Sequence, residues 1–258
     1  LLALTFPRDA TENWTQQFFA GAQEALTAHG TYCLGGDTNF SPEPAFTCTA
    51  LGRITDAVPL QRLGAKAGDR VYVTGQLGGG NLLGLARQAD LTTWERLEKD
   101  YRPIARLKES RALRPWMNCA IDTSDALLQA LGIITDLNRV GMVFRHHPGL
   151  YDPRLVKLAE AIRFPLWLVN IFGMGEYELV FTVTPHREEE FLKDASTRGI
   201  KTLCIGELIS EPGITLQMDN TSYVLDIVYL LNLFGTSPSL DAYIKAILQY
   251  DAKLKGSQ

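Results

Sequence analysis

The 258-residue sequence has few cysteines, and they lie far apart, at Cys33, Cys48, Cys119 and Cys204. No C-x-x-C pair occurs, so the sequence signals neither a zinc site nor a disulfide framework. This usage predicts reduced, mostly buried thiols in a cytoplasmic protein.

Basic runs and long apolar runs are also missing. The formal net charge is -4, and no basic block is interleaved with aromatic residues, so nucleic acid is not an expected partner. The longest apolar stretch, VLDIVYLLNLF at 224–234, is interrupted by Asp226 and Asn232 and is too short to cross a bilayer. We therefore expect no membrane span either.

What the sequence contains is a mixture of helical and extended patterns, with 46% hydrophobic and 21% charged residues. Helices are expected at about 11–29, 81–89, 153–163 and 186–198, and strands at about 45–54, 70–74, 177–183 and 202–209. Helix and loop are expected over 92–117, and a strand then a helix over 118–139. This mixing without strict alternation predicts an α/β or α+β fold with mixed sheets.

The stretch NCAIDTSDALLQAL (118–131) crowds Asp122, Thr123, Ser124 and Asp125 between an apolar run and a helical pattern. We expect the helix to start near Ser124. One interpretation is capping of the first helical turn. The other is magnesium binding, because two neighbouring carboxylates can share a hard cation with phosphate oxygens. From these residues alone both interpretations stay open.

Other polar motifs are weaker. CLGGDTNFSP places Asp37 after two glycines, where a plain turn is favoured over a phosphate and metal contact. GMGEYELVF sets Glu176 and Glu178 at the mouth of a strand, where alternation favours a solvated face. GQLGGG lacks the Lys and Ser/Thr of a P-loop. His146 and His147 read as surface histidines rather than metal ligands.

Taken in order, five stretches resemble the thiamine-monophosphate kinases, within the wider superfamily of AIR synthase, selenophosphate synthetase and the hydrogenase maturation ATPase. They are GGDTNFSPEPAFTCTALGRI, RLGAKAGDRVYVTGQLGGG, AIDTSDALLQAL, GMGEYELVFTV and CIGELI. They are collinear and cover about residues 1–210. At the matching places family members typically read G-G-D-T-T-R, A-I-D-I-S-D-G-L and G-G-E-D-Y-E-L.

The resemblance implies an AIR-synthase-like architecture of two α/β domains, dimerised through the N-terminal domains, with ATP held between domains and Mg²⁺ bridging its phosphates to aspartates. It implies ATP-dependent phosphorylation of thiamine monophosphate to thiamine diphosphate by a cytoplasmic homodimer. By similarity, the expected ATP contacts are Gly36, Asp37, Arg62 and Ser124, the metal ligands Asp37, Asp122 and Asp125, and the substrate contact Glu176.

The sequence also departs from the family pattern. Ala126 replaces the glycine after the second aspartate, and Gly175 aligns with the glutamate that contacts substrate in the family, so that Glu176 takes the place of the next aspartate. In the tail, residues 211–258, the likeness fades. There SLDAYIKAILQYDAKL has the pattern of an amphipathic helix.

The opening LLALTFP reads as the interior of a strand, and family members carry further metal-binding aspartates upstream of the matching segment. We therefore expect residues 1–55 to be an incomplete N-terminal, ATP-binding and dimer-forming domain, and 56–258 to be the C-terminal α/β domain. A truncated or diverged homologue that binds nucleotide or a partner without catalysis stays open as the alternative.

Overall fold

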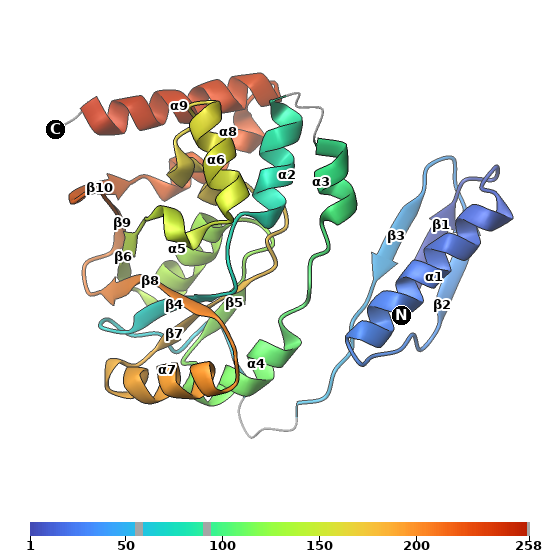
Figure 1. The fold of residues 1–258 in the computed structure, drawn as a ribbon, viewed down its shortest axis with the longest axis horizontal. Helices are drawn as coiled ribbons and strands as arrows, with labels where there is room; N and C mark the ends of the chain where they lie inside the picture. Colours follow the sequence, from blue (N-terminus) through green and yellow to red (C-terminus); the bar gives the residue numbers. More distant parts are fainter. Residues whose placement is uncertain (55–58, 90–93, 257–258) are drawn as a thin grey trace. The chain divides into compact units, whose positions relative to one another are not determined.

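The computed structural model describes residues 1–54, 59–89 and 94–256, drawn in Figure 1. The chain divides into two compact units, Leu1–Pro59 and Leu60–Gln258, and each is described by itself. The boundary expected between residues 55 and 56 lies outside the described residues, so the assignment of two domains stays a prediction.

The first unit is a three-stranded sheet with one helix. Its elements are β1 (Leu2–Phe6), α1 (Glu12–Ala28), β2 (Gly36–Phe40) and β3 (Ala45–Cys48). The central strand β1 is parallel to β2 and antiparallel to β3. Helix α1 supplies the crossover that a parallel pair requires, and its first turn is capped by Thr11, which accepts a hydrogen bond from the Trp14 backbone N–H at 3.2 Å.

A small aromatic cluster holds this unit together. The Phe6 ring lies 5.5 to 6.1 Å from the rings of Trp14, Phe18, Phe19 and Phe46. Within residues 1–54, Leu4 and Phe6 are buried, whereas every residue of β2 and β3 is exposed. The outer strands of this sheet are therefore open in the single chain.

The second unit contains a seven-stranded sheet in the order β10-β9-β6-β8-β4-β7-β5. The strands are β4 (Arg70–Thr74), β5 (Ala120–Asp122), β6 (Gly141–Arg145), β7 (Leu179–Val183), β8 (Thr202–Ile209), β9 (Gly213–Met218) and β10 (Thr221–Leu225). The pair β6–β9 is parallel and the other neighbours are antiparallel. This mixed sheet confirms the predicted α/β fold class.

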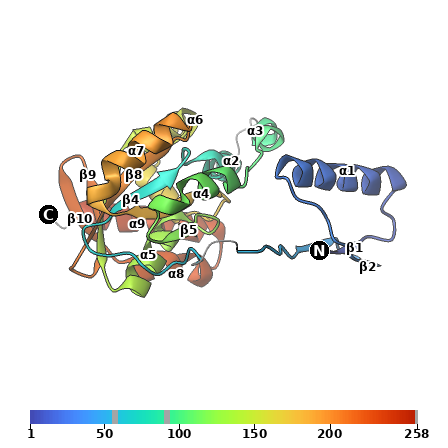
Figure 2. The same cartoon turned by 90° about the horizontal axis from the view of Figure 1, so that it is seen from below.

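Helices cover both faces of this sheet (Figures 1 and 2). One face carries α2 (Gly79–Gln88), α5 (Leu127–Asn138), α6 (Pro153–Ala161), α8 (Ile227–Thr236) and α9 (Leu240–Gly256), and the other carries α4 (Leu107–Leu113) and α7 (Glu188–Thr197). In β4, Val71 and Val73 join the larger core while Tyr72 joins the smaller one. Because successive strand residues point to opposite faces, one strand serves both layers.

Shorter elements complete the unit. Helix α3 (Trp94–Asp100) follows α2, and 3₁₀ turns lie at Arg114–Trp116, Pro148–Leu150, Leu166–Ile171 and Pro185–Arg187. Across the described residues, no helix combines the length and apolarity that a membrane crossing would need.

The strands predicted at 70–74 and 202–209 are confirmed, as is a helix over SLDAYIKAILQYDAKL, which is α9. The strand predicted at 45–54 is shorter, and the one predicted at 177–183 begins two residues later, at Leu179. In the segment 92–117, residues 92 and 93 lie outside the described part. The expectation of mostly buried thiols is wrong, since one cysteine is buried and three are exposed.

Candidate functional site

The two predicted aspartates of the second unit lie at the junction of β5 and α5, Asp122 as the last residue of β5 and Asp125 in the loop that follows. Strand β5 ends at Asp122 and α5 begins at Leu127. Asp122 and Asp125 are exposed, whereas Thr123 between them has no exposed surface. The loop therefore buries its threonine and presents both carboxylates to solvent.

Helix capping does not explain these carboxylates. The predicted helix start near Ser124 is wrong, because α5 begins three residues later and no side chain caps it. The residue before the helix, Ala126, has φ 146° and ψ 153°, a region that is almost reserved for glycine. Tertiary packing rather than local capping sets the helix start, since Ala126 is 1% exposed.

Asp122 is held in its ionised form. Hydrogen bonding by Ser124, whose backbone N–H lies 3.3 Å from Asp122 Oδ2, lowers the pKa of Asp122, partial burial opposes this, and the charge of Arg62 lowers it further. The structure thus brings Asp122, Ser124 and Arg62 together in one region of the second unit, with Asp125 in the same loop. Arg62 is itself exposed.

This carboxylate pair fits a shared magnesium ion better than a metal cage. Within the described residues, no three His, Cys, Asp or Glu side chains gather closely enough to hold a metal by themselves. Mg²⁺ is usually bound through one or two carboxylates together with substrate phosphates and waters. Asp122 and Asp125 are of the ligand type that a protein contributes to such a site.

Gly36 and Asp37 belong to the first unit. The expected turn there is wrong, because both residues lie in β2, with Gly36 opposite Leu2 and Asp37 opposite Ala3. A Cβ at Gly36 would lie 1.7 Å from the Leu2 carbonyl oxygen, so strand packing alone demands glycine. Asp37 is exposed, and its contact with ATP and metal stays a prediction.

The glutamates before β7 do not form the solvated face that alternation predicted. Glu176 accepts hydrogen bonds from the backbone N–H groups of Gly78 at 2.7 Å and Asn81 at 2.9 Å, so it caps the positive end of α2. Burial raises the pKa of Glu176, and the hydrogen bonds from these amides oppose the rise. Both carboxylate oxygens are therefore already occupied by the protein.

Glu178 is 3% exposed and carries a complete set of partners. Its carboxylate accepts from Thr74 Oγ1 at 2.6 Å and from Arg106 Nε at 2.7 Å, with Arg106 Nη2 as a second guanidinium donor. Burial alone would lower the pKa of Arg106, but the hydrogen bonds and charge of Glu178 outweigh it and raise that pKa. The pair is a buried, bidentate ion pair.

The departure from the family pattern at Gly175 has a structural reason. Gly175 has φ 74°, and a Cβ there would lie 2.7 Å from the Tyr177 ring. A glutamate at this position would combine a left-handed backbone with a steric clash. Because Tyr177 is 46% exposed and its ring can move, the left-handed backbone is the stronger of the two reasons for glycine at this position.

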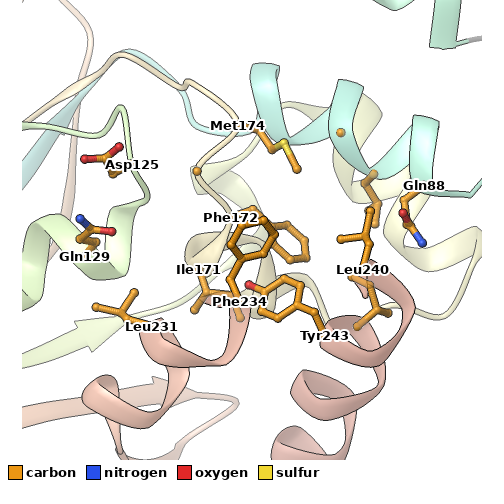
Figure 3. Close-up of a pocket in the computed structure, with 14 residues that line it drawn as sticks. Gln88, Asp125, Gln129, Ile171, Phe172, Met174, Leu231, Phe234, Leu240 and Tyr243 are labelled. Carbon is orange, nitrogen blue, oxygen red and sulfur yellow. The ribbon is translucent and has the colours of Figure 1, made fainter. Parts of the chain in front are cut away.

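An apolar pocket of about 360 Å³ adjoins the aspartate loop. Figure 3 shows Asp125 and Gln129 at one side and the rings of Phe172, Phe234 and Tyr243 near the middle. The Phe234 and Tyr243 ring centroids are 5.3 Å apart. Helices α8 and α9 supply part of the lining, so the tail, residues 211–258, contributes to the pocket.

The comparisons with known proteins first define the class. Residues 1–54 match the family of AIR synthase related proteins, N-terminal domain. The crystal structure of thiamine-monophosphate kinase from Stenotrophomonas maltophilia K279a superposes with a TM-score of 0.72 at 24% identity, covering 85% of this chain and 72% of that one. The fold is AIR-synthase-like, as predicted.

The identity of this chain to curated relatives then shows which family it belongs to. Thiamine-monophosphate kinase of Escherichia coli K12 is 30% identical over 233 residues, which cover 87% of this chain and 70% of that protein. The chain belongs to the thiamine-monophosphate kinase family and is a kinase. A solved structure described as "AaThiL complexed with AMPPCP and TMP" has a TM-score of 0.66 at 20% identity, covering 86% of this chain and 69% of that one.

Proposed function

We propose that this protein transfers the γ-phosphoryl group of ATP to thiamine monophosphate, giving thiamine diphosphate, with Mg²⁺ as cofactor. Family membership supports the reaction. The observation that carries it is the exposed Asp122–Asp125 pair, because phosphoryl transfer needs mainly positioning and charge neutralisation. Asp125 makes no ion pair within the described part of the chain, which leaves its carboxylate available to a cation.

Asp122 and Asp125 would hold magnesium in this proposal, and Asp37, in the first unit, stays a predicted metal ligand. Bound magnesium supplies positive charge against the phosphates of ATP. Arg62 adds a fixed positive charge near Asp122, and Ser124 lies between the two aspartates, so both are proposed ATP contacts. Gly36 stays a predicted ATP contact in the first unit.

The pocket beside Asp125 is the proposed place for the two rings of the acceptor. Its volume, about 360 Å³, is within the range of small-ligand sites. Thiamine monophosphate carries a cationic thiazolium ring, which the aromatic faces of Phe172, Phe234 and Tyr243 would attract. Its phosphate would then lie toward the metal-binding aspartates.

For Glu176 we propose an indirect role toward the acceptor. Because its two oxygens accept from the Gly78 amide, just before α2, and from the Asn81 amide within α2, it holds residues 173–175 against the start of α2. Met174 in that segment lines the pocket. The predicted direct contact of Glu176 with substrate is therefore replaced, in this proposal, by support of the pocket wall.

The proposal includes a homodimer formed through the first unit, in the cytoplasm. Residues of β2 and β3 are exposed throughout, among them Phe40 and Phe46. Sheets with open edges and apolar surface favour pairing with a second copy.

The test is formation of thiamine diphosphate from thiamine monophosphate and ATP by the purified chain, with magnesium and with EDTA. Calorimetric titration of ATP under both conditions accompanies it. We expect turnover and tight ATP binding in the presence of magnesium, and neither in the presence of EDTA. Magnesium-dependent ATP binding without product would favour the non-catalytic homologue, and equal ATP affinities in magnesium and EDTA would contradict the metal assignment.

A further inference from the structure

We propose that the segment Gly173–Glu178 positions the aspartate loop, and that Thr123 is the positioning residue through which it acts. This inference rests on the proposed function, because the loop matters only if Asp122 and Asp125 hold a cation. Thr123 has no exposed surface, so it acts on a ligand only through its neighbours.

Thr123 and Glu178 are joined by two reciprocal hydrogen bonds. The Thr123 backbone N–H donates to the Glu178 carbonyl oxygen at 2.9 Å, and the Glu178 backbone N–H donates to Thr123 Oγ1 at 3.0 Å. The β5–β7 pairing ends with Asp122 opposite Leu179. Thr123 and Glu178 therefore continue the ladder by one more pair, in which a threonine hydroxyl takes the place of a backbone carbonyl.

The side-chain contacts of Glu178 hold its backbone in place, and through it the position of Thr123. The Glu178 side chain is buried and bonded to Arg106 and to Thr74 Oγ1. The same Thr74 hydroxyl oxygen accepts from the Leu179 backbone N–H at 2.9 Å, so the start of β7 is tied to the end of β4. Moving Glu178 would break a buried ion pair and several hydrogen bonds together.

The N-terminal end of the segment Gly173–Glu178 contacts the backbone of Asp125. A Cβ at Gly173 would lie 2.7 Å from the Asp125 carbonyl oxygen, so the two backbones are in direct contact. The segment thus supports the loop at Thr123 and again at Asp125. Two supports on one short loop define the separation of its two carboxylates.

This separation matters because Mg²⁺ demands near-ideal octahedral geometry. Outer residues that orient metal ligands typically change metal affinity by 10- to 100-fold when mutated. Thr123→Val keeps the shape of the side chain and removes the acceptor of the Glu178 N–H. Thr123→Ser keeps that acceptor.

The experiment measures the magnesium dependence of ATP binding and of turnover in the full chain. We expect Thr123→Val to weaken the apparent magnesium affinity by about 10- to 100-fold, while kcat at saturating magnesium falls much less. Thr123→Ser is expected to behave like wild type. Thr182→Val is the matched control, because Thr182 is also fully buried, lies in β7, and has Cys119 as the contact of its hydroxyl.

Unchanged magnesium affinity in Thr123→Val, or an equal loss in Thr182→Val, would overturn the inference and leave the proposed function intact. If wild type itself shows no magnesium-dependent ATP binding, both proposals fail together. Should Thr123→Val not fold, Gly173→Ala tests the second support. It is expected to displace Asp125 and weaken magnesium affinity in the same direction, and wild-type affinity there would overturn the inference.

Discussion

Two acidic segments of the second unit look alike in sequence and differ in structure. D-T-S-D ends at Asp125 and E-Y-E ends at Glu178, and each places two carboxylates within four residues beside a strand. Asp122 and Asp125 are exposed, whereas Glu178 is 3% exposed and bonded to Arg106. The first segment presents its charges to solvent, and the second uses them inside the protein.

The difference shows what separates a ligand-binding carboxylate from a structural one. The carboxylate of Glu178 accepts hydrogen bonds from a guanidinium and a hydroxyl. It therefore has few lone pairs left to bind an external cation. The pKa directions agree, because Ser124 lowers the pKa of Asp122 while burial raises that of Glu176. The exposed segment is suited to chemistry and the buried one to positioning.

The largest expected effect comes from neutralising the exposed segment. Asp122→Asn and Asp125→Asn should each lower turnover by about 100- to 1,000-fold, because each removes a charge that the proposed function assigns to magnesium binding. The free energy of unfolding should change by about 0.5 kcal/mol or less, as is usual for exposed side chains. Steady-state kinetics and urea unfolding on the same preparations measure both quantities.

Asp136→Asn is the matched control, because Asp136 is an exposed aspartate within α5. It should leave turnover unchanged. An equal loss of turnover at all three positions would point to a general charge effect. Wild-type turnover in both loop variants would remove the proposed distinction between the two segments.

Neutralising the buried carboxylate of Glu178 should instead lower the free energy of unfolding. Glu178→Gln leaves the Arg106 guanidinium partly buried beside a neutral amide, and breaking a buried ion pair in this way costs about 3 kcal/mol. Chemical denaturation measures the loss. Glu109→Gln removes the second carboxylate near Arg106, at 3.4 Å, and is expected to cost about 0.5 kcal/mol, as for partly exposed pairs. Equal losses would contradict a special role for Glu178.

The fold could be predicted to a large extent because its signals are local. The strand at 70–74 and the amphipathic helix near the end of the chain follow from periodicity over a few residues, and both are confirmed. The sequence also indicates the aspartate loop, since Asp122 and Asp125 lie within four residues of one another. It does not indicate the hydrogen-bond partners of Glu178, because these residues are far away in sequence.

Alternation counted from Tyr177 predicts a solvated Glu178, but the strand starts only at Leu179. Its partners Thr74 and Arg106 lie 104 and 72 residues away, so no local pattern announces them. A buried carboxylate of this kind is recognised only once the fold brings its counter-ion to it. The sequence alone leaves the role of Asp122 and Asp125 open, because helix capping and metal binding use the same residue types.

A smaller effect is expected at the residue that follows the exposed segment. Ala126 has φ 146°, which costs about 1 to 3 kcal/mol for a residue with a side chain. Ala126→Gly relieves this strain and should stabilise the fold by about 1 kcal/mol after the larger chain entropy of glycine is subtracted. Thermal and urea unfolding measure the gain.

Ala130→Gly is the control of opposite sign, since Ala130 is buried inside α5. It should destabilise the protein by at least about 1 kcal/mol. The same sign of change at both positions would contradict backbone strain at Ala126.

The smallest expected effect concerns the pH dependence of stability, to which Glu176 and Asp122 should contribute with opposite signs. Glu176 has a raised pKa in the fold, so the folded state binds its proton more tightly than the unfolded chain does. The wild-type protein should therefore lose stability relative to Glu176→Gln as the pH rises above the ordinary value of 4.5.

Asp122 has a lowered pKa, so its contribution is fully present above the ordinary value of 3.8 and is lost as the pH falls through the folded pKa. Wild type should gain stability relative to Asp122→Asn as the pH rises through that range. Urea unfolding of wild type and both variants across a pH series gives the two slopes. Slopes of the same sign would show that the two segments hold their carboxylates in similar environments, because opposite shifts in pKa require opposite proton linkage.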